Sequence, residues 1–465
     1  MSRHLTPGQA SRRAFLQRGG LLSLVGAAAP WALNLASMAE AAAQSSGAQG
    51  YKALVCVFLQ GGNDHANTVL PYDPAEHQAY AQARGSIALT RESLAGTLLG
   101  GTPGGRPLAW APALAPLHSL QTEGRLATLL NIGPLVQPTS LAQYRARSVP
   151  LPPKLFSHND QQSVWQSYGA EGSTAGWGGR TADLLLSGNG QASLTCINTA
   201  GSAVYLAGQD AVPYMVNPSG VPELSALGAP FGMFGSAACR DALQQIIGQT
   251  TQAHVLAAEH ARITARALDV NARLRSALSA QAALPTAFDE GNPLAKQLRM
   301  VAQLLQARTT LSMSRQVFFV QLGGFDLHDN LSAQHPVLLG RVAAALVQFQ
   351  QALDALGLAQ QVTTFTASDF GRTLNSNGDG SDHGWGAHHL VLGGAVQGGA
   401  VYGQWPDTVL GGAQDVGQGR LLPTTSVLQL AVALARWMGV SPSDFGLVAP
   451  GHGAFDGAAL SGLLA

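Results

Sequence analysis

The chain has 465 residues, enough for a large domain with a sizeable core, and 46% of them are hydrophobic. Only 11% are charged, below the roughly 25% of an average soluble domain, and the formal net charge is zero. Because no basic stripe or positive excess is present, the composition gives no electrostatic reason to expect a nucleic acid partner.

The first 43 residues have the features of a targeting segment. The sequence SRRAFLQ begins at Ser11, and the weakly apolar stretch after it ends in small residues, among them Ala39, Ala41 and Ala43. Glycine, proline and asparagine interrupt this stretch, which makes it a poor transmembrane helix. We interpret residues 1–43 as a twin-arginine signal peptide, and an ordinary secretory signal or a retained anchor is the alternative. We therefore expect a periplasmic or secreted protein with the twin-arginine export machinery as a partner and no permanent membrane span.

Short apolar runs alternate with helical patterns along residues 44–465. The runs KALVCVFL, RQVFFVQL and QVTTFTAS each stop at a polar or glycine-rich loop, which is typical of buried parallel strands. Apolar residues recur at spacings of three and four from Leu338 to Leu356, and they predict a helix that ends at Gly357. This alternation predicts an α/β domain with a largely parallel sheet.

Residues from about 236 to 311 differ from the rest of the chain. They are rich in alanine, glutamine, leucine and arginine and lack strand signals, so we expect a helical insertion, either a hairpin between strands or a cap. The three cysteines are too few and too scattered for a disulfide framework, although a bridge between Cys196 and Cys239 stays open.

Ionisable side chains gather in loops that follow four of the predicted strands. Because the carboxyl ends of parallel strands meet at one edge of a sheet, we expect these loops to lie together. Carboxylates collected there repel one another unless a cation or a proton neutralises them, and aspartate with histidine suits Zn, Mn or another divalent ion. Turn formation and helix capping are the alternative roles for single aspartates in such loops. The residues concerned are Asn63, Asp64 and His65, then Asp326 and His328, then Asp369 and Arg372, then Asp382, His383, His388 and His389.

Five segments occur in an order that resembles an exported bacterial family called domain of unknown function 1501. The segments are FLQGGNDHANTVLPYD, LFSHNDQQSVWQ, GGFDLHDN, TASDFGRT and SDHGWGAHHLVLGGAVQGGAVYG. The resemblance covers nearly all the chain after the predicted signal. It places the chain with the alkaline phosphatase and sulfatase superfamily, which implies a three-layer α/β/α sandwich. It also implies divalent metal ions, with Zn, Mn or Ca as the candidates, held by aspartates and histidines at strand ends.

The same resemblance implies roles for individual residues. Ser157, with His158 beside it, lies where the superfamily carries its nucleophile, so both are candidate catalytic residues, although Ser157 also has the sequence context of a helix cap. His335 is a rival to His328, and Arg372 could bind an anionic group or form a salt bridge. Either His388 or His389 could complete a metal site. The implied metal ligands are Asp64, Asp326, His328, Asp369, Asp382 and His383, and the implied substrate-binding residues are Asn63, Arg372, His388 and His389.

From the clustered groups and the resemblance, we expect an exported metal-dependent hydrolase that acts on small anionic esters of phosphate or sulfate. The alternative is a non-catalytic exported protein of the cell envelope that binds metal or takes part in assembly while keeping the superfamily fold. A metal-free serine esterase fits less well, since no Gly-x-Ser-x-Gly sequence surrounds Ser157.

Overall fold

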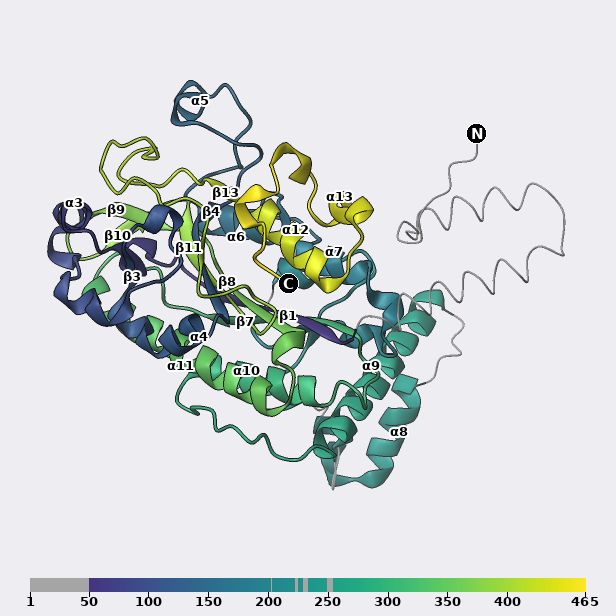
Figure 1. Ribbon diagram of the computed structural model, residues 1–465. Coiled ribbons are helices and arrows are strands. Elements are labelled where there is room, and N and C mark those ends of the chain that lie inside the picture. Colours follow the sequence, from purple (N-terminus) through teal and green to yellow (C-terminus); the bar gives the residue numbers. More distant parts are fainter. Residues whose placement is uncertain (1–49, 202, 222–224, 229–232, 249–253) are drawn as a thin grey trace, which may run out of the picture.

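The computed structural model describes residues 50–465 except 202, 222–224, 229–232 and 249–253 (Figure 1). The predicted signal peptide, residues 1–43, lies outside the described residues. No helix in the described part of the chain is both long enough and apolar enough to cross a membrane.

A nine-stranded sheet forms the centre of the described chain, in the order β12, β4, β11, β8, β1, β7, β5, β6, with β13 also paired to β4. Strand β11 is antiparallel to β4 and β8, and the other pairings are parallel. The strands are β1 (Lys52–Leu59), β4 (Leu126–Gly133), β5 (Cys196–Asn198), β6 (Tyr214–Met215), β7 (Arg315–Leu322), β8 (Val362–Ser368), β11 (Ala387–Leu392), β12 (Val401–Tyr402) and β13 (Thr425–Ser426).

Helices cover both faces of this sheet, and two small sheets lie outside it (Figure 1). The small sheets pair β2 (Val69–Pro71) with β3 (Leu108–Trp110) and β9 (Arg372–Ser376) with β10 (Ser381–His383). The helices are α3 (Pro74–Arg84), α4 (His118–Thr122), α5 (Leu141–Ala146), α6 (His158–Ser167), α7 (Trp177–Asp183), α8 (Ala237–Gly248), α9 (Val255–Ser279), α10 (Pro293–Gln306), α11 (Leu331–Ala355), α12 (Val427–Met438) and α13 (Phe445–Val448).

Strand β1 shows why both faces need covering. Successive side chains of a strand point to opposite faces, and Val55 and Val57 lie in a core with α10 and α11. Cys56 and Phe58 lie instead in a second core with α6, α7, α12 and α13. All four side chains are at most 2% exposed. The structure therefore confirms the predicted three-layer α/β/α sandwich with a largely parallel sheet.

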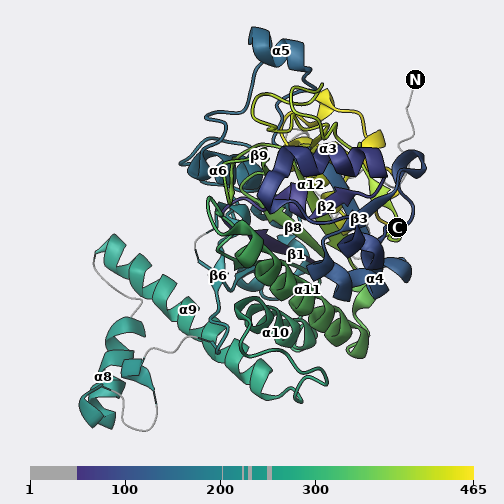
Figure 2. The same cartoon turned by 90° about the vertical axis from the view of Figure 1, so that its left-hand side faces the viewer.

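The helix predicted from Leu338 to Leu356 matches the second part of α11, which ends at Ala355 and is capped by Leu356. Gly357 comes next with a φ of 66°, in the region that favours glycine. The region from 236 to 311 contains α8, α9 and α10 and no strand among its described residues. Helix α10 packs against α11 and β7 as part of the sandwich, whereas α8 and most of α9 project from the body (Figure 2). Cys196 and Cys239 are both free.

Candidate metal centre

Three neighbouring strands deliver polar loops to one edge of the sheet. In the register of the sheet, Leu59 of β1 lies opposite Leu322 of β7 and Ser368 of β8, so the three strands end together. Asp326 and Asp369 follow β7 and β8 at that edge. The loops approach closely: a Cβ on Gly61, where φ is +117°, would lie 2.3 Å from the backbone nitrogen of Asp326. This packing holds Asp326 beside the end of β1.

Among the described residues, His158, Asp326 and His383 bring three possible metal ligand atoms together. His158 begins α6, Asp326 follows β7 and His383 ends β10. The Nε2 atoms of the two histidines are 3.1 Å apart, and they lie 3.4 Å and 3.6 Å from Oδ1 of Asp326. Ligand atoms around a tetrahedral Zn²⁺ at its usual bond lengths are separated by roughly 3.3 Å. The three side chains therefore fit three corners of such a site.

The remaining ring nitrogen of each histidine is held by an oxygen. Nδ1 of His383 lies 2.8 Å from the carbonyl oxygen of Phe156, and Nδ1 of His158 lies 2.6 Å from Oδ2 of Asp369. Since a carbonyl and a carboxylate only accept, both Nδ1 atoms donate, and each neutral ring presents an unprotonated Nε2. Metal-binding histidines are oriented in this way. Phe156 itself has a φ of 72°, which is uncommon for a residue other than glycine.

Two unprotonated nitrogens that face each other at 3.1 Å need a proton or a cation between them. The hydrogen bond to Asp369 raises the pKa of His158, whereas burial lowers the pKa of His383. Burial alone would raise the pKa of Asp326, but the hydrogen bond and charge of Arg372, with His158 and His328 nearby, lower it. The group therefore combines one carboxylate with two imidazoles whose lone pairs converge, which is a suitable set of ligands for a divalent cation.

His328 lies beside two corners of this group. Its Nε2 is 3.0 Å from Nε2 of His383 and 3.1 Å from Oδ1 of Asp326, while its Nδ1 is 3.1 Å from Oδ1 of Asp382. Asn377 also donates to this oxygen of Asp382. The structure thus brings the predicted ligand His328 to the centre, and it places the predicted ligand Asp382 behind that histidine.

Asp369 and Arg372 are completely buried and hold the centre from inside the protein. Asp369 accepts from His158, from Nε2 of Gln162 at 2.7 Å and from the backbone nitrogen of Gly61 at 3.0 Å. Arg372 donates to Asp326 at 2.9 Å, and its other bonds go to the Gly61 carbonyl and to Ser381. Because these bonds occupy both carboxylate oxygens and every guanidinium nitrogen, Asp369 supports a ligand instead of serving as one, and Arg372 is not free to bind substrate.

The structure does not bring Asp64, a predicted metal ligand, into this group. Its carboxylate pairs with the guanidinium of Arg84 on α3, and both side chains are at most 1% exposed. Burial alone would raise the pKa of Asp64, but the nearby charges, led by Arg84, lower it. A cation supplied by the chain itself therefore occupies the position beside Asp64.

The other predicted substrate-binding residues also face inward. Asn63 is 1% exposed, and its amide bonds to Thr68 and to Nε2 of His335. His388 and His389 are each 2% exposed, and they are the second and third residues of β11 in the central sheet. The structure therefore places these three predicted substrate-binding residues in the interior of the protein.

Ser157, the predicted nucleophile, is half-buried and immediately precedes His158. It occupies the N-cap position of α6, but its hydroxyl makes no capping bond and donates instead to Oδ2 of Asp160 at 2.9 Å. The structure therefore places His158, predicted as catalytic, among the three candidate metal ligands, with a serine hydroxyl in the adjacent position.

Four supporting residues were not predicted from the sequence. Phe156 accepts from His383, and Gln162 donates to Asp369, the carboxylate that holds His158. The buried ring of Phe370 lies 4.7 Å and 4.8 Å from the rings of His158 and His383. Arg420 donates from Nε to the carbonyl oxygen of His383 at 2.8 Å and lies 4.7 Å from the ring of Phe156. Phe156 lies in the segment LFSHND next to Ser157 and His158, so its neighbourhood in the sequence could have suggested a role at the site. Arg420 has no such local signal, because its partner His383 lies 37 residues earlier in the chain.

The family model described as "Protein of unknown function (DUF1501)" matches residues 51–445. This chain belongs to that family. The recognised resemblance is thereby confirmed over nearly all the described residues. Among curated proteins, no significant match is found.

Two solved structures are similar to this chain at low sequence identity and low TM-score. The PsFucS1 sulfatase from Pseudoalteromonas sp. has 10% identity and a TM-score of 0.34, with 87% of this chain and 70% of that chain covered. Ps i-CgsB, crystallised with neocarrahexaose, has 9% identity and a TM-score of 0.31, with 86% and 74% covered.

Proposed function

We propose that this family member is a metal-dependent hydrolase of phosphate or sulfate esters. The observation that supports the proposal is the convergence of Nε2 of His158, Nε2 of His383 and Oδ1 of Asp326, within 3.1 to 3.6 Å of one another. His328 stands next to two of them as a further ligand. Zn²⁺ or Mn²⁺ suits this mixture of imidazole and carboxylate better than Ca²⁺, which prefers oxygen alone.

A divalent cation bound here would supply positive charge to polarise an ester oxygen and to lower the pKa of a hydroxyl or water beside it. The protein's residues set the conditions for that chemistry. Asp369 and the Phe156 carbonyl keep the two histidine rings in the tautomer that presents Nε2. Arg372 fixes Oδ1 of Asp326 from the buried side.

Two cationic side chains near the start of α6 and the end of β10 can contribute to binding an anionic ester. Arg420 is partly exposed. Lys154, with 71% of its side chain exposed, lies two residues before Phe156, and its Nζ is 3.6 Å from Oδ1 of Asp160. The planar guanidinium of Arg420 is oriented by its bond to the His383 carbonyl and by the ring of Phe156. These two residues take over the substrate-binding role predicted for Arg372, which is buried.

We assign the nucleophile to Ser157. Its hydroxyl donates to the buried carboxylate of Asp160, which is the partner that would accept the proton during attack. The serine oxygen would form a bond to phosphorus or sulfur while the bond to the leaving-group oxygen breaks, and water would then release the acid from the serine. In the alternative mechanism, water attacks directly and Ser157 only orders the start of α6.

The test compares metal content and ester turnover in the mature protein and in matched variants. We expect about one metal ion per chain, and hydrolysis of an aryl phosphate or an aryl sulfate, in the unmodified protein. His383→Ala and His158→Ala should lose both, while His260→Ala, an exposed histidine of α9, should keep both. Metal-free unmodified protein, or full turnover in His383→Ala, would refute the proposal.

Further results of the same experiment separate the mechanisms. Ser157→Ala should abolish turnover while keeping the metal, and unchanged turnover in this variant would assign the attack to water. Bound metal without turnover on any ester would instead support the non-catalytic metal-binding role. For that role, a stable partner that copurifies with the protein would be the positive evidence.

Export by the twin-arginine route is part of the proposal and rests on the sequence SRRAFLQ. Replacing Arg12 and Arg13 together by lysine should keep the protein in the cytoplasm with its signal uncleaved. Cell fractionation checks this expectation, and normal export of the double variant would contradict it.

A further inference from the structure

A separate cavity of about 700 Å³ lies among three segments that are far apart in the sequence. Its walls come from the loop after β4, from the loop between β12 and β13, and from the C-terminal residues 455–459. This volume lies within the range of about 300 to 1,000 Å³ that is usual for ligand pockets. No residue that lines it belongs to the metal centre or bonds to the metal-centre side chains.

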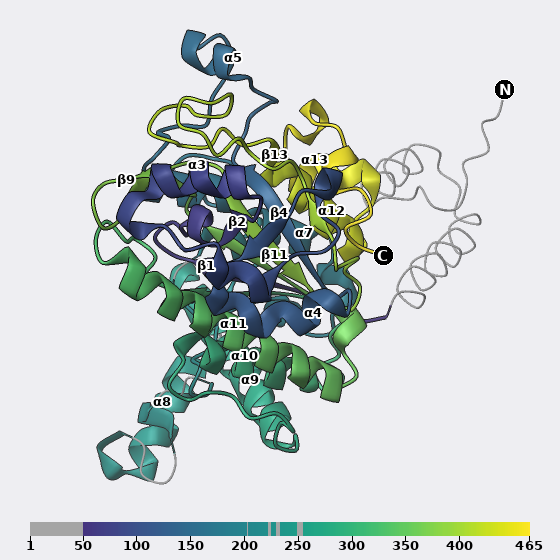
Figure 3. The ribbon, with the colours of Figure 1, turned by 60° about the vertical axis from the view of Figure 1, so that its left-hand side comes forward.

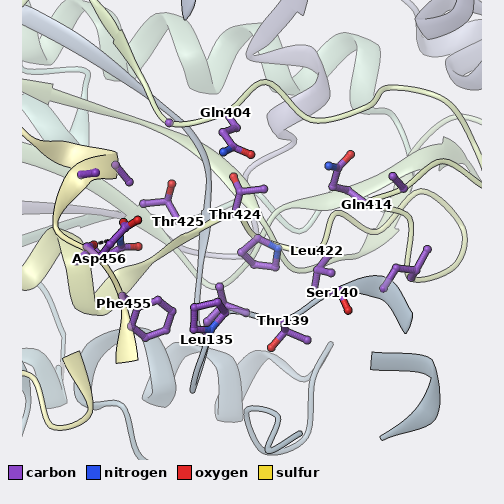
Figure 4. Close-up of a pocket in the computed structure, with 18 residues that line it drawn as sticks. Leu135, Thr139, Ser140, Gln404, Gln414, Leu422, Thr424, Thr425, Phe455 and Asp456 are labelled. Atoms are coloured by element: carbon purple, nitrogen blue, oxygen red, sulfur yellow. Dashed lines mark hydrogen bonds between the residues drawn. The ribbon is translucent and has the colours of Figure 1, made fainter. Parts of the chain in front are cut away.

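Several polar groups in the cavity have no partner among the described residues. The hydroxyl of Thr424 is buried without a hydrogen bond, and the side-chain amide of Gln404, which is exposed to solvent, bonds to no described residue. Gln414 uses only its oxygen, which accepts from the backbone nitrogen of Asp407 at 3.0 Å. Figure 4 shows Gln404, Thr424 and Thr425 on one side of the cavity, with Phe455 on the other. A buried hydroxyl left unpaired is unfavourable, so a ligand group at this position would be stabilised.

The wall of the cavity formed by Phe455 and Asp456 is fixed by hydrogen bonds and apolar packing. Gln429 at the start of α12 accepts from the backbone nitrogen of Ser426 at 2.8 Å and donates to the carbonyl oxygen of Asp456 at 2.7 Å. Phe455, the residue before Asp456, packs against two apolar clusters of the interior. The aromatic face and the Asp456 carboxylate are therefore presented by an anchored segment.

The chemistry of the lining defines what it can bind. No lysine, arginine or histidine lines the cavity, and Asp456 is its one ionisable residue, so phosphate or sulfate groups would be repelled. Amides and hydroxyls both donate and accept, as the hydroxyls of a sugar do, and a phenyl face suits the apolar face of a sugar ring. Peptides are bound mainly through main-chain bonds at strand edges or in grooves, whereas the free groups here are side-chain amides and hydroxyls.

We propose that this cavity is a binding site for a neutral saccharide, distinct from the metal centre. The site is independent of the proposed hydrolase activity, because its recognition groups are neutral and its lining shares no residue with the metal group. Binding therefore needs no metal.

Calorimetric titration of the mature protein tests the proposal with cellohexaose, maltohexaose and chitohexaose as neutral probes. Dextran sulfate and a glycine–serine hexapeptide serve as the anionic and peptide probes. We expect at least one neutral oligosaccharide to bind, with unchanged affinity after the metal is removed by a chelator. Binding of only the sulfated or only the peptide probe, or of none of the neutral probes, would overturn the proposal.

Three variants locate the site. Gln404→Ala and Thr424→Val each remove one unpaired polar group and should weaken binding about tenfold, and Ala413→Trp should abolish it by filling the cavity from an exposed position. Gln351→Ala, an exposed glutamine of α11, is the matched control and should bind normally. Thermal unfolding of each variant verifies folding. Unchanged oligosaccharide binding in folded Ala413→Trp would show that the saccharide site is elsewhere.

Discussion

Two groups of ionisable side chains come from the strands, loops and helices around the same sheet edge, and they differ in how far they are exposed. The side chains of the metal centre, His158, Asp326 and His383, are partly exposed. The Nε2 atoms of its two histidines face each other at 3.1 Å. The second group, which we call the buried polar cluster, consists of Asp64, His65, Arg84, His335, His388 and His389 and is at most 2% exposed. There, the guanidinium of Arg84 supplies the positive charge that Asp64 needs.

The difference shows what decides whether a cluster of this kind can take an exchangeable ion. Each group contains a carboxylate that bonds to a buried guanidinium, Asp64 to Arg84 and Asp326 to Arg372. Asp64 is enclosed with its guanidinium, whereas Asp326 also faces two imidazoles at a partly exposed position, and imidazoles that converge on one point leave space for an ion from solution. The four experiments below separate the two groups, beginning with the largest effect.

Acid should destabilise the protein through the buried polar cluster. Burial lowers the pKa of His65 and His335 to about 4 and that of His389 to about 3, and it holds the pKa of His388 well below its usual range. An unfolded chain binds these protons near pH 6.5, so the stability present above that pH is lost as the pH falls toward 4. The slope should reach up to roughly 5 kcal/mol per pH unit if all four histidines contribute.

Urea unfolding at a series of pH values between 7 and 4.5 measures this loss. His335→Gln should reduce the slope by about one proton, and His260→Gln, at an exposed position, should leave it unchanged. Stability that stays constant over this interval would mean that the four histidines are not buried in neutral form.

Arg84→Met should destabilise the fold by about 3 to 5 kcal/mol, because it leaves the Asp64 carboxylate buried without a counter-charge. Arg106→Met breaks an ion pair with Glu76 in which both side chains are about a third exposed or more, and it should cost less than about 1 kcal/mol. Chemical denaturation of the two variants gives the comparison. Equal losses would contradict the assignment of Arg84 as the internal cation.

Asp369→Asn should weaken zinc binding about 10- to 100-fold, since an asparagine no longer holds Nδ1 of His158 with a charged acceptor. Asp379→Asn is the matched control: its carboxylate accepts from the backbone nitrogen of Asn330 and contacts no metal-centre histidine. Competition with a fluorescent zinc chelator measures both affinities. If Asp369→Asn lowers the melting temperature but leaves zinc affinity intact, the role of Asp369 is structural only.

Asp382→Asn should have the smallest effect, a weakening of zinc binding of only a few fold. The carboxylate of Asp382 is 41% exposed, and an asparagine oxygen can still accept from Nδ1 of His328. The same competition assay applies. A loss as large as that of His383→Ala would show that Asp382 is itself a ligand.

Local sequence patterns were enough to predict the layers and the edge at which polar groups gather. Strand-like runs such as RQVFFVQL carry their own signal, because apolar β-branched and aromatic residues bounded by glycine are typical of buried strands. Asp326, His328 and His383 could be chosen for the same reason, since they lie in the polar segments that come after such runs.

The partners of these residues could not be chosen in that way. Arg84 reaches Asp64 from the end of α3, and His158 reaches His383 across 225 positions. A scan of the sequence weighs Asp64 and Asp326 equally, because both are aspartates after a strand and a glycine pair. Asp64 is enclosed in the interior with the guanidinium of Arg84, whereas Asp326, which bonds to the guanidinium of Arg372, also faces two imidazoles at a partly open edge.

The amino-acid sequence by itself determined the family, the alternation of strands and helices, and the set of polar loops at the strand ends, since these follow from short-range periodicity and local motifs. Tertiary structure alone decided that Asp64 is enclosed with a guanidinium, whereas Asp326, also bonded to a guanidinium, faces two imidazoles at a partly open edge. The physical reason is that electrostatic pairing depends on distance and burial between segments far apart in sequence, and packing of the helices and loops around the sheet sets both.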